Sequence, residues 1–172
     1  MRKPRQRLDI VALLILLATP MTSRGDEITP TPPPTPTQSF RFAPPPEVGR
    51  KHTSIAVVIG GNRSDVPGVP ALRFADDDAV RYQELFSLFA TRGDLLAVLD
   101  EDTQRRHPGM AGVSRVPTRE EVLAALDRAH REITEAKTRG ETTALYFVFA
   151  GHGFVGENQE GYLVLQDGRL TR

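Results

Sequence analysis

The sequence predicts an α/β fold organised around a parallel β-sheet. Residues 54–60 and 144–150 form short apolar runs, rich in β-branched or aromatic side chains, as expected for strands buried on both faces. A third apolar run, 95–99, lies between two segments in which apolar residues recur at helical spacing. This alternation of strand and helix is typical of a parallel sheet with right-handed crossovers. We therefore expect one α/β domain over residues 51–172.

The first half of this domain should contain two strands and one helix. The first strand, 54–60, is followed by apolar residues at helical spacing from position 75, which predict a helix that ends near Gly93. Residues 95–99 then form the second strand. The polar stretch 100–116 contains a proline and two glycines and is expected to be a loop.

The second helix has the clearest start signal. Thr118 followed by Glu121 forms a capping box. An apolar stripe follows it and should run to about Thr138: Val122, Leu126, Ala129 and Ile133. Residues 144–150 are expected to form the third and most buried strand, and 162–165 a further short strand.

The N-terminal 50 residues predict export rather than a folded domain. Four basic residues among the first seven precede an apolar run at 10–18, far shorter than the roughly 20 residues that span a bilayer. We interpret 1–25 as a signal peptide; an uncleaved membrane anchor or a wrongly assigned start codon are the alternatives. Eight prolines make 26–50 a stiff, extended linker, or else a polyproline ligand. The mature protein is expected in the periplasm or outside the cell, with no stable membrane insertion after signal cleavage.

Composition excludes several classes of function. The chain has 22 basic and 22 acidic residues, but five basic residues lie within the first 25, so the remainder carries an acidic excess that argues against nucleic-acid binding. Gly60-Gly61-Asn62 lacks both a Walker lysine and the third glycine of a dinucleotide loop, so these glycines are expected to be turn residues. No cofactor is predicted. The chain has no cysteine, so it has no thiolate metal site. His52, His107 and His130 are not spaced so that two of them could bind one metal ion, and no metal site is predicted from them.

His152 is the strongest candidate for chemistry. It follows the strand 144–150 between Gly151 and Gly153, and sites in parallel sheets gather at the carboxyl ends of strands. An imidazole exchanges a proton near neutral pH, and the backbone N–H of Gly153 could donate to an oxyanion. These residues alone leave open a catalytic base, a structural turn histidine and a metal ligand. The acidic run 76–78 either complements the positive end of a helix or recognises a cationic substrate group.

Taken in order, these segments resemble the caspase-like cysteine peptidases of clan CD (peptidase family C14), especially the bacterial and metacaspase-like members. The resemblance covers about 54–167 and rests on the order and spacing of five pieces. They are Ile55 to Asn62, Leu72 with Ala75 and Asp78-Ala79, Pro117 to Val122, Tyr146 to Gly153, and Gly161-Tyr162-Leu163.

The resemblance implies a cysteine endopeptidase in which a His–Cys dyad cleaves a peptide or protein substrate. His152 would be the catalytic histidine, and the Gly153 N–H would be half of the oxyanion hole. In the caspase pattern the cysteine lies about 50 residues after the histidine. This chain has no cysteine, so the caspase-like fold is expected to be incomplete at the C-terminus and inactive as it stands.

Two residues predict opposite specificities within this family. Asp78 resembles the acidic residue with which metacaspases hold a P1 Arg or Lys, and Leu72 to Ala79 matches the metacaspase spacing without a gap. Arg73 lies one position out of register with the arginine with which caspases hold a P1 Asp, so Asp78 is favoured. The alternatives to a peptidase are a non-enzymatic caspase-like interaction module and a fragment of an α/β-hydrolase.

Overall fold

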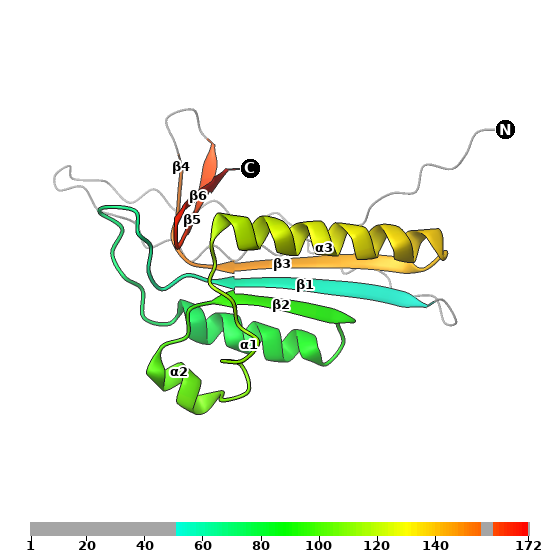
Figure 1. The fold of residues 1–172 in the computed structure, drawn as a ribbon, viewed down its shortest axis with the longest axis horizontal. Coiled ribbons are helices and arrows are strands. Elements are labelled where there is room, and N and C mark those ends of the chain that lie inside the picture. Colours follow the sequence, from blue (N-terminus) through cyan, green and yellow to red (C-terminus); the bar gives the residue numbers. More distant parts are fainter. Residues whose placement is uncertain (1–50, 156–159, 172) are drawn as a thin grey trace, which may run out of the picture.

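A three-stranded parallel sheet forms the centre of the molecule, which confirms the predicted α/β class (Figure 1). The computed structural model describes residues 51–155 and 160–171. The predicted signal peptide and linker, residues 1–50, lie outside the described residues. Within the described part, no helix is both long and apolar enough to cross a membrane.

The central strand of this sheet is the first one. β1 (His52–Gly60) lies between β2 (Arg92–Ala97) and β3 (Thr142–Ala150), and every residue of β1 after His52 is buried. The prediction that β3 is the most buried strand is wrong. Residues 142–147 are only half-buried, because β3 lies at an edge of the sheet and β1 covers just one side of it.

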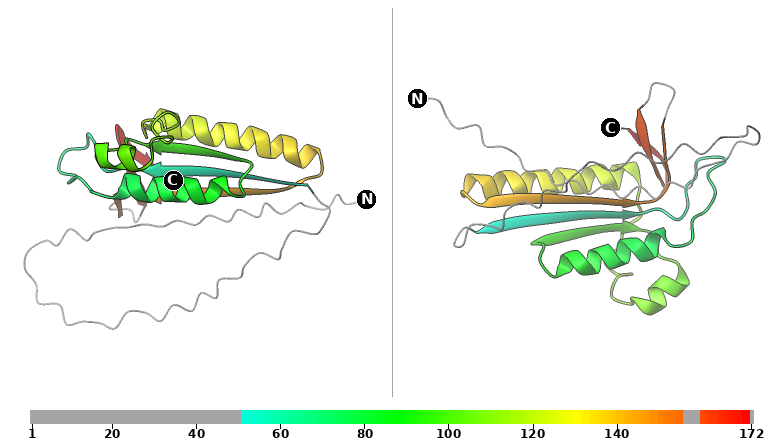
Figure 2. Two further views of the ribbon diagram at one scale, coloured as in Figure 1. Left: turned by 90° about the horizontal axis from the view of Figure 1, so that it is seen from below. Right: turned by 180° about the vertical axis from the view of Figure 1, so that it is seen from behind.

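Helices cover both faces of the sheet (Figures 1 and 2). α1 (Ala75–Ser87) packs on the face that carries Ala56 and Val58 of β1. α3 (Arg119–Thr138) packs on the opposite face. Successive side chains of a strand point to opposite faces, so the continuous apolar run of β1 supplies both cores at once.

The elements between β1 and α3 differ from their predicted positions. α1 ends at Ser87 rather than near Gly93, and β2 begins at Arg92, because residues 92–97 pair with β1 in a parallel ladder. The predicted loop 100–116 contains a short helix, α2 (Glu101–Arg106). Its sequence has no apolar periodicity; it is held by an N-cap, in which the Thr103 N–H donates to the Asp100 carboxylate at 2.8 Å.

The predicted start of the second helix is confirmed, although only half of the capping box forms. The Thr118 hydroxyl accepts a hydrogen bond from the Glu121 N–H at 3.2 Å. The Thr118 N–H, which would close the box on the Glu121 side chain, donates instead to the Val116 carbonyl at 2.8 Å.

A second, antiparallel sheet stands at the carboxyl end of the first (Figure 1). It contains β4 (Gly153–Val155), β5 (Gly161–Leu165) and β6 (Gly168–Thr171) in that order. The strand predicted at 162–165 is therefore present, but in this separate sheet. The Ser64 hydroxyl donates to the Leu165 carbonyl at 2.6 Å, which fixes β5 against the loop that follows β1.

Candidate functional site

The candidate site lies at the carboxyl ends of β1 and β3, whose helical connections pack on opposite faces of the parallel sheet. β1 and β3 are neighbours, and their last residues, Gly60 and Ala150, are paired in register. β1 leads into α1 on one face, whereas β3 is entered from α3 on the other face. In open parallel sheets, a crevice forms at such a switch point beyond the carboxyl ends of the strands. Residues that follow β1 and β3 are therefore placed to act together.

A hydrogen bond of His152 joins the segments that follow β3 and β1. This residue follows β3, and its Nε2 lies 2.8 Å from the carbonyl oxygen of Pro70, in the loop between β1 and α1. A carbonyl oxygen only accepts hydrogen bonds, so Nε2 carries a proton and donates it. In the neutral imidazole, Nδ1 then keeps its lone pair and is free to accept a proton. The predicted catalytic histidine is thus held in one orientation and one tautomer.

The backbone on both sides of His152 is also held. The His152 carbonyl accepts a hydrogen bond from the Val164 N–H of β5 at 2.9 Å, and the Ala150 carbonyl accepts one from the Gly61 N–H at 2.9 Å. A Cβ atom at Gly151 would lie 2.7 Å from the Phe149 ring, so this glycine is required by packing. The histidine therefore stands on a rigid support between the two sheets.

The backbone N–H of Gly153 is turned away from the second sheet. Gly153 pairs with Leu163, and the neighbouring pair is the hydrogen-bonded one, because the Val164 N–H donates to the His152 carbonyl. Hydrogen-bonded and non-bonded pairs alternate in an antiparallel ladder, so the Gly153 N–H points away from β5. The Gly153 N–H therefore has no backbone partner among the described residues.

Two carboxylates of the acidic run serve the fold rather than a substrate. Asp76 and Asp77 are buried at the start of α1. Asp76 accepts hydrogen bonds from the Asn62 side chain at 2.5 Å and the Asp100 N–H at 2.9 Å. Asp77 forms an ion pair of 2.9 Å with Arg106. Asp76 thus joins the loops after β1 and β2, and Asp77 joins α1 to α2, so neither is available to recognise a substrate cation.

Asp78 and Arg73, the two candidate specificity residues, occupy different environments. Asp78 is half-buried in the first turn of α1, and its carboxylate has no hydrogen-bond or ion-pair partner among the described residues. Arg73 is exposed, and its guanidinium lies 5.6 Å from the centre of the Phe74 ring. It lies three positions after Pro70, the residue that accepts the hydrogen bond of His152.

Arg73 also lines a charged pocket of about 400 Å³. Its lining contains three arginines, three aspartates and three apolar residues. They are Arg63, Arg73 and Arg106; Asp77, Asp100 and Asp102; and Ala71, Leu72 and Phe74. The Thr103 N–H bonded to Asp100 lowers the pKa of that carboxyl. The hydrogen bond from Arg106 to Asp102 raises the pKa of the arginine, so both groups are charged at neutral pH.

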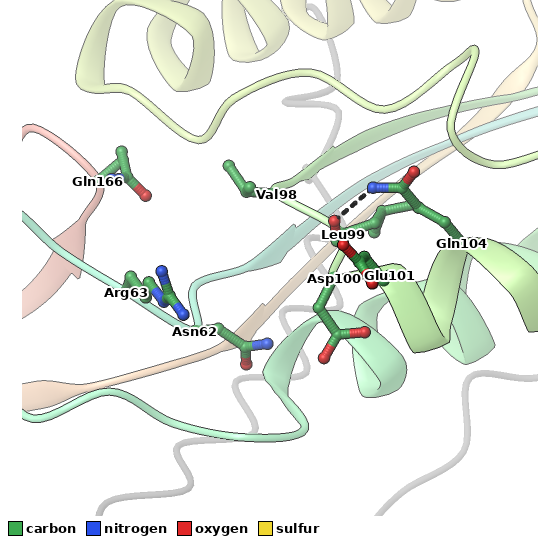
Figure 3. Close-up of a pocket in the computed structure, with 8 residues that line it drawn as sticks. All are labelled: Asn62, Arg63, Val98, Leu99, Asp100, Glu101, Gln104 and Gln166. Carbon is green, nitrogen blue, oxygen red and sulfur yellow. Dashed lines mark hydrogen bonds between the residues drawn. The ribbon is translucent and has the colours of Figure 1, made fainter.

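A second pocket, of about 560 Å³, opens beyond the carboxyl ends of β1 and β2 (Figure 3). Its walls come from three segments and comprise Asn62, Arg63, Val98, Leu99, Asp100, Glu101, Gln104 and Gln166. The Gln104 side chain donates to the Leu99 carbonyl at 2.7 Å. Neither pocket is lined by His152 or Asp78.

Sequence reasoning missed two residues that organise the site. Pro70 contributes a backbone carbonyl, whose role depends on the path of a loop and has no sequence signal. Asn62 accepts a hydrogen bond from the Ala75 N–H at 2.7 Å, and so caps α1 from a distance. The residue before α1 is Phe74, whose side chain cannot accept a hydrogen bond. The absence of a local capping residue was the only sign in the sequence that a distant residue such as Asn62 caps this helix.

The described residues contain no cluster of three or more His, Asp or Glu side chains that could hold a metal ion. No protein-family model, curated protein or solved structure matches the chain.

Proposed function

We propose that this chain carries the histidine half of a caspase-like cysteine endopeptidase site, which acts with a cysteine thiol supplied from outside these 172 residues. The observation that carries the proposal is the bridge from His152 Nε2 to the Pro70 carbonyl across the switch point of the sheet. The α/β order of the elements and the spacing of the motifs also support it.

In this mechanism His152, Gly153 and Pro70 each have one task. Nδ1 of His152 takes the thiol proton as the sulfur attacks the substrate carbonyl, and the N–H of Gly153 stabilises the oxyanion. The same imidazole then gives that proton to the leaving amine as the peptide C–N bond breaks. Water subsequently hydrolyses the thioester. The Pro70 carbonyl keeps the ring oriented through both proton transfers.

The first test is a reading of the genomic DNA. We expect translation downstream of codon 172, in one of the three frames, to contain an apolar strand that ends in a cysteine. A stop codon without such a strand in any frame would overturn the peptidase proposal. A non-enzymatic binding module with the same fold would then be the better interpretation.

The second test is enzymatic and uses the continuous product that such a reading defines. We expect cleavage of peptides with Arg or Lys at P1, as the assignment of Asp78 implies, and a loss of about 10²- to 10⁴-fold in kcat on His152→Ala. His130→Ala is the matched control, because His130 is exposed on α3. Cleavage only after Asp would show that Arg73, and not Asp78, determines which P1 residue the enzyme accepts. Unchanged kcat in His152→Ala would exclude the proposed role of the histidine.

A further inference from the structure

We propose that an apolar patch at the end of α1 binds residues 40–46 of the same chain (FRFAPPP), so that the folded unit begins at Phe40 rather than at β1. The patch lies at the amino-terminal ends of the strands, at the other end of the sheet from His152, and the proposal does not rest on the chemistry proposed for that residue. It rests on the exposed side chains of the patch, on the place where β1 enters the domain, and on the aromatic residues of the linker.

Three large apolar side chains are exposed together at the end of α1. Leu85, Leu88 and Phe89, which we call the α1 patch, are 50%, 80% and 52% exposed. The N–H groups of Leu88 and Phe89 continue the helical turn, because they donate to the carbonyls of Leu85 and Phe86 at 3.2 Å and 3.1 Å. Residues three and four apart are neighbours on a helix surface, so Leu85 lies beside the other two side chains. Contiguous exposed apolar patches mark binding surfaces, whereas single exposed apolar residues are normal.

An aromatic cluster adjoins the α1 patch. The ring centre of Phe89 lies 5.5 Å from that of Phe86 and 5.7 Å from that of Tyr146, and Tyr82 lies 6.5 Å from Phe86. Phe86 is buried, whereas Tyr82 and Tyr146 are half-buried. Proline-rich segments bind surfaces lined with aromatic rings, because proline holds the chain in the extended conformation before it binds. The chemistry of the α1 patch therefore suits a proline-rich partner.

The start of β1 brings the linker to this patch. The Ser54 hydroxyl donates to the Phe89 carbonyl at 3.2 Å, and the Thr91 N–H donates to the Ser54 carbonyl at 2.7 Å. An extended chain covers about 3.3 Å per residue, so the residues between Phe42 and Ser54 can span about 40 Å, whereas α1 is roughly 20 Å long. Residues 40–46 can therefore reach every part of the patch. Because both partners belong to one chain, their effective concentration is high and modest affinity suffices.

The linker sequence itself indicates a packing role. Phe40 and Phe42 are the only aromatic residues among the first 50. A segment that acts only as a tether is expected to lack aromatic residues, which are scarce in sequences without a packed core. Alternate residues of an extended segment point to the same side, so Phe40 and Phe42 face the patch together while Arg41 faces water. The earlier prolines, within 30–36, have no aromatic neighbour, which is why we assign the contact to 40–46.

Trypsin tests the contact at a site that the chain already has. Arg41 lies inside the proposed segment, whereas Arg24 lies outside it. Cleavage after Arg41 must wait until the segment leaves the patch, so in the native 172-residue chain we expect it to be at least about tenfold slower than cleavage after Arg24. Mass spectrometry of timed samples measures both rates, each divided by the rate for a synthetic peptide with the same site. Equal corrected rates would overturn the proposal.

A double variant of the patch tests where the segment binds. Leu85→Ser with Leu88→Ser changes two side chains that are at least half exposed and leaves the cleavage sites intact. We expect cleavage after Arg41 to accelerate about tenfold, to the corrected rate for Arg24. Leu123→Ser, at an exposed leucine of α3, is the matched control and should keep the protection. Protection that survives the double variant, or that rises with protein concentration as binding to a second copy would, contradicts the proposal.

Thermal unfolding tests the same contact from both sides. Phe40→Ser with Phe42→Ser should lower the melting temperature of the 172-residue chain by about 3 °C. Ile28→Ser, an apolar change elsewhere in the linker, should leave it unchanged. In the Leu85→Ser, Leu88→Ser background the phenylalanine changes should have no further effect, because the contact is already lost. Fully additive decreases would show that the two sets of residues do not interact, and would refute the proposal.

Discussion

Gly60 illustrates how a single residue acquires its role from a neighbouring helix. Gly60 and Gly61 were expected to be turn residues, but Gly60 is the last residue of β1 and lies directly under α1. A Cβ atom there would lie 2.6 Å from the Ala75 carbonyl oxygen and 2.7 Å from the Ala79 Cβ. The expectation for Gly60 is therefore wrong, since close packing of helix on strand, and not a turn conformation, requires the glycine.

Gly60→Ala should consequently destabilise the protein by about 1–3 kcal/mol, because the backbone of α1 must move to accommodate the methyl group. Gly61→Ala is the matched control. A Cβ at Gly61 would meet only the Val164 carbonyl oxygen at 3.7 Å, an ordinary contact, so we expect a change within about 0.5 kcal/mol. Urea unfolding of both variants measures the difference. Equal stabilities would show that α1 shifts without cost.

At the scale of elements, Glu141 joins three segments at the start of β3. Its carboxylate is 4% exposed, accepts a hydrogen bond from Arg139 Nε at 2.8 Å and also accepts one from the Thr53 hydroxyl of β1. Lys51 lies 3.8 Å away. The hydrogen bond from Arg139, followed by that from Thr53, lowers the pKa of Glu141 to about 2. The charged carboxylate therefore clamps the end of α3 to β1.

This clamp predicts a pH-dependent stability. Because the pKa of Glu141 is lower in the folded protein than its ordinary value of 4.5, its stabilisation is complete above pH 4.5 and is lost as the pH falls towards about 2. Glu141→Gln should lower the urea midpoint at pH 7, and the difference from wild type should shrink between pH 4.5 and 2. Glu120→Gln, whose exposed side chain forms no ion pair among the described residues, should show no such window.

Across the whole molecule, Asp94 connects parts of the chain that are distant in sequence. This carboxylate of β2 is 6% exposed and is surrounded by three arginines. Arg92 lies in the same strand and forms an ion pair with it. Arg115, in the segment that covers β2, lies 2.6 Å from the Asp94 carboxylate, and Arg128 of α3 lies 3.4 Å from it. One buried carboxylate thus holds the β2 edge and α3 in place.

Asp94→Ala should cost about 1–3 kcal/mol, because it removes a buried acceptor from three arginines, although Arg92 keeps Glu132 and Arg115 keeps Glu121 as partners. Asp102→Ala is the comparison, because Asp102 also has two arginine partners, Arg105 and Arg106, but its side chain is 60% exposed. We expect a loss of at most about 1 kcal/mol there. Thermal unfolding distinguishes the two cases. A small effect for Asp94→Ala would mean that water hydrates the three arginines without a loss of folding free energy.

Local patterns predicted what depends on neighbours in sequence. The three parallel strands, the two long helices and the Thr118 cap were expected from apolar periodicity and capping residues, and they are present. His152 was singled out because it follows a buried strand, and it does lie at the carboxyl edge of the sheet. Its catalytic role, like those of Gly153, Asp78 and Arg73, stays a prediction.

What the amino-acid sequence determined by itself was therefore the class of the fold, its long elements and the position of the histidine. Tertiary structure alone decided the strand order that makes β1 central and β3 an edge, the second sheet, the Pro70 carbonyl that orients His152, and the ion pairs of Asp77 and Asp94. The reason is physical. Periodicity and caps record interactions within a few residues, whereas strand order and buried charge pairs depend on contacts between distant segments, which leave no local pattern.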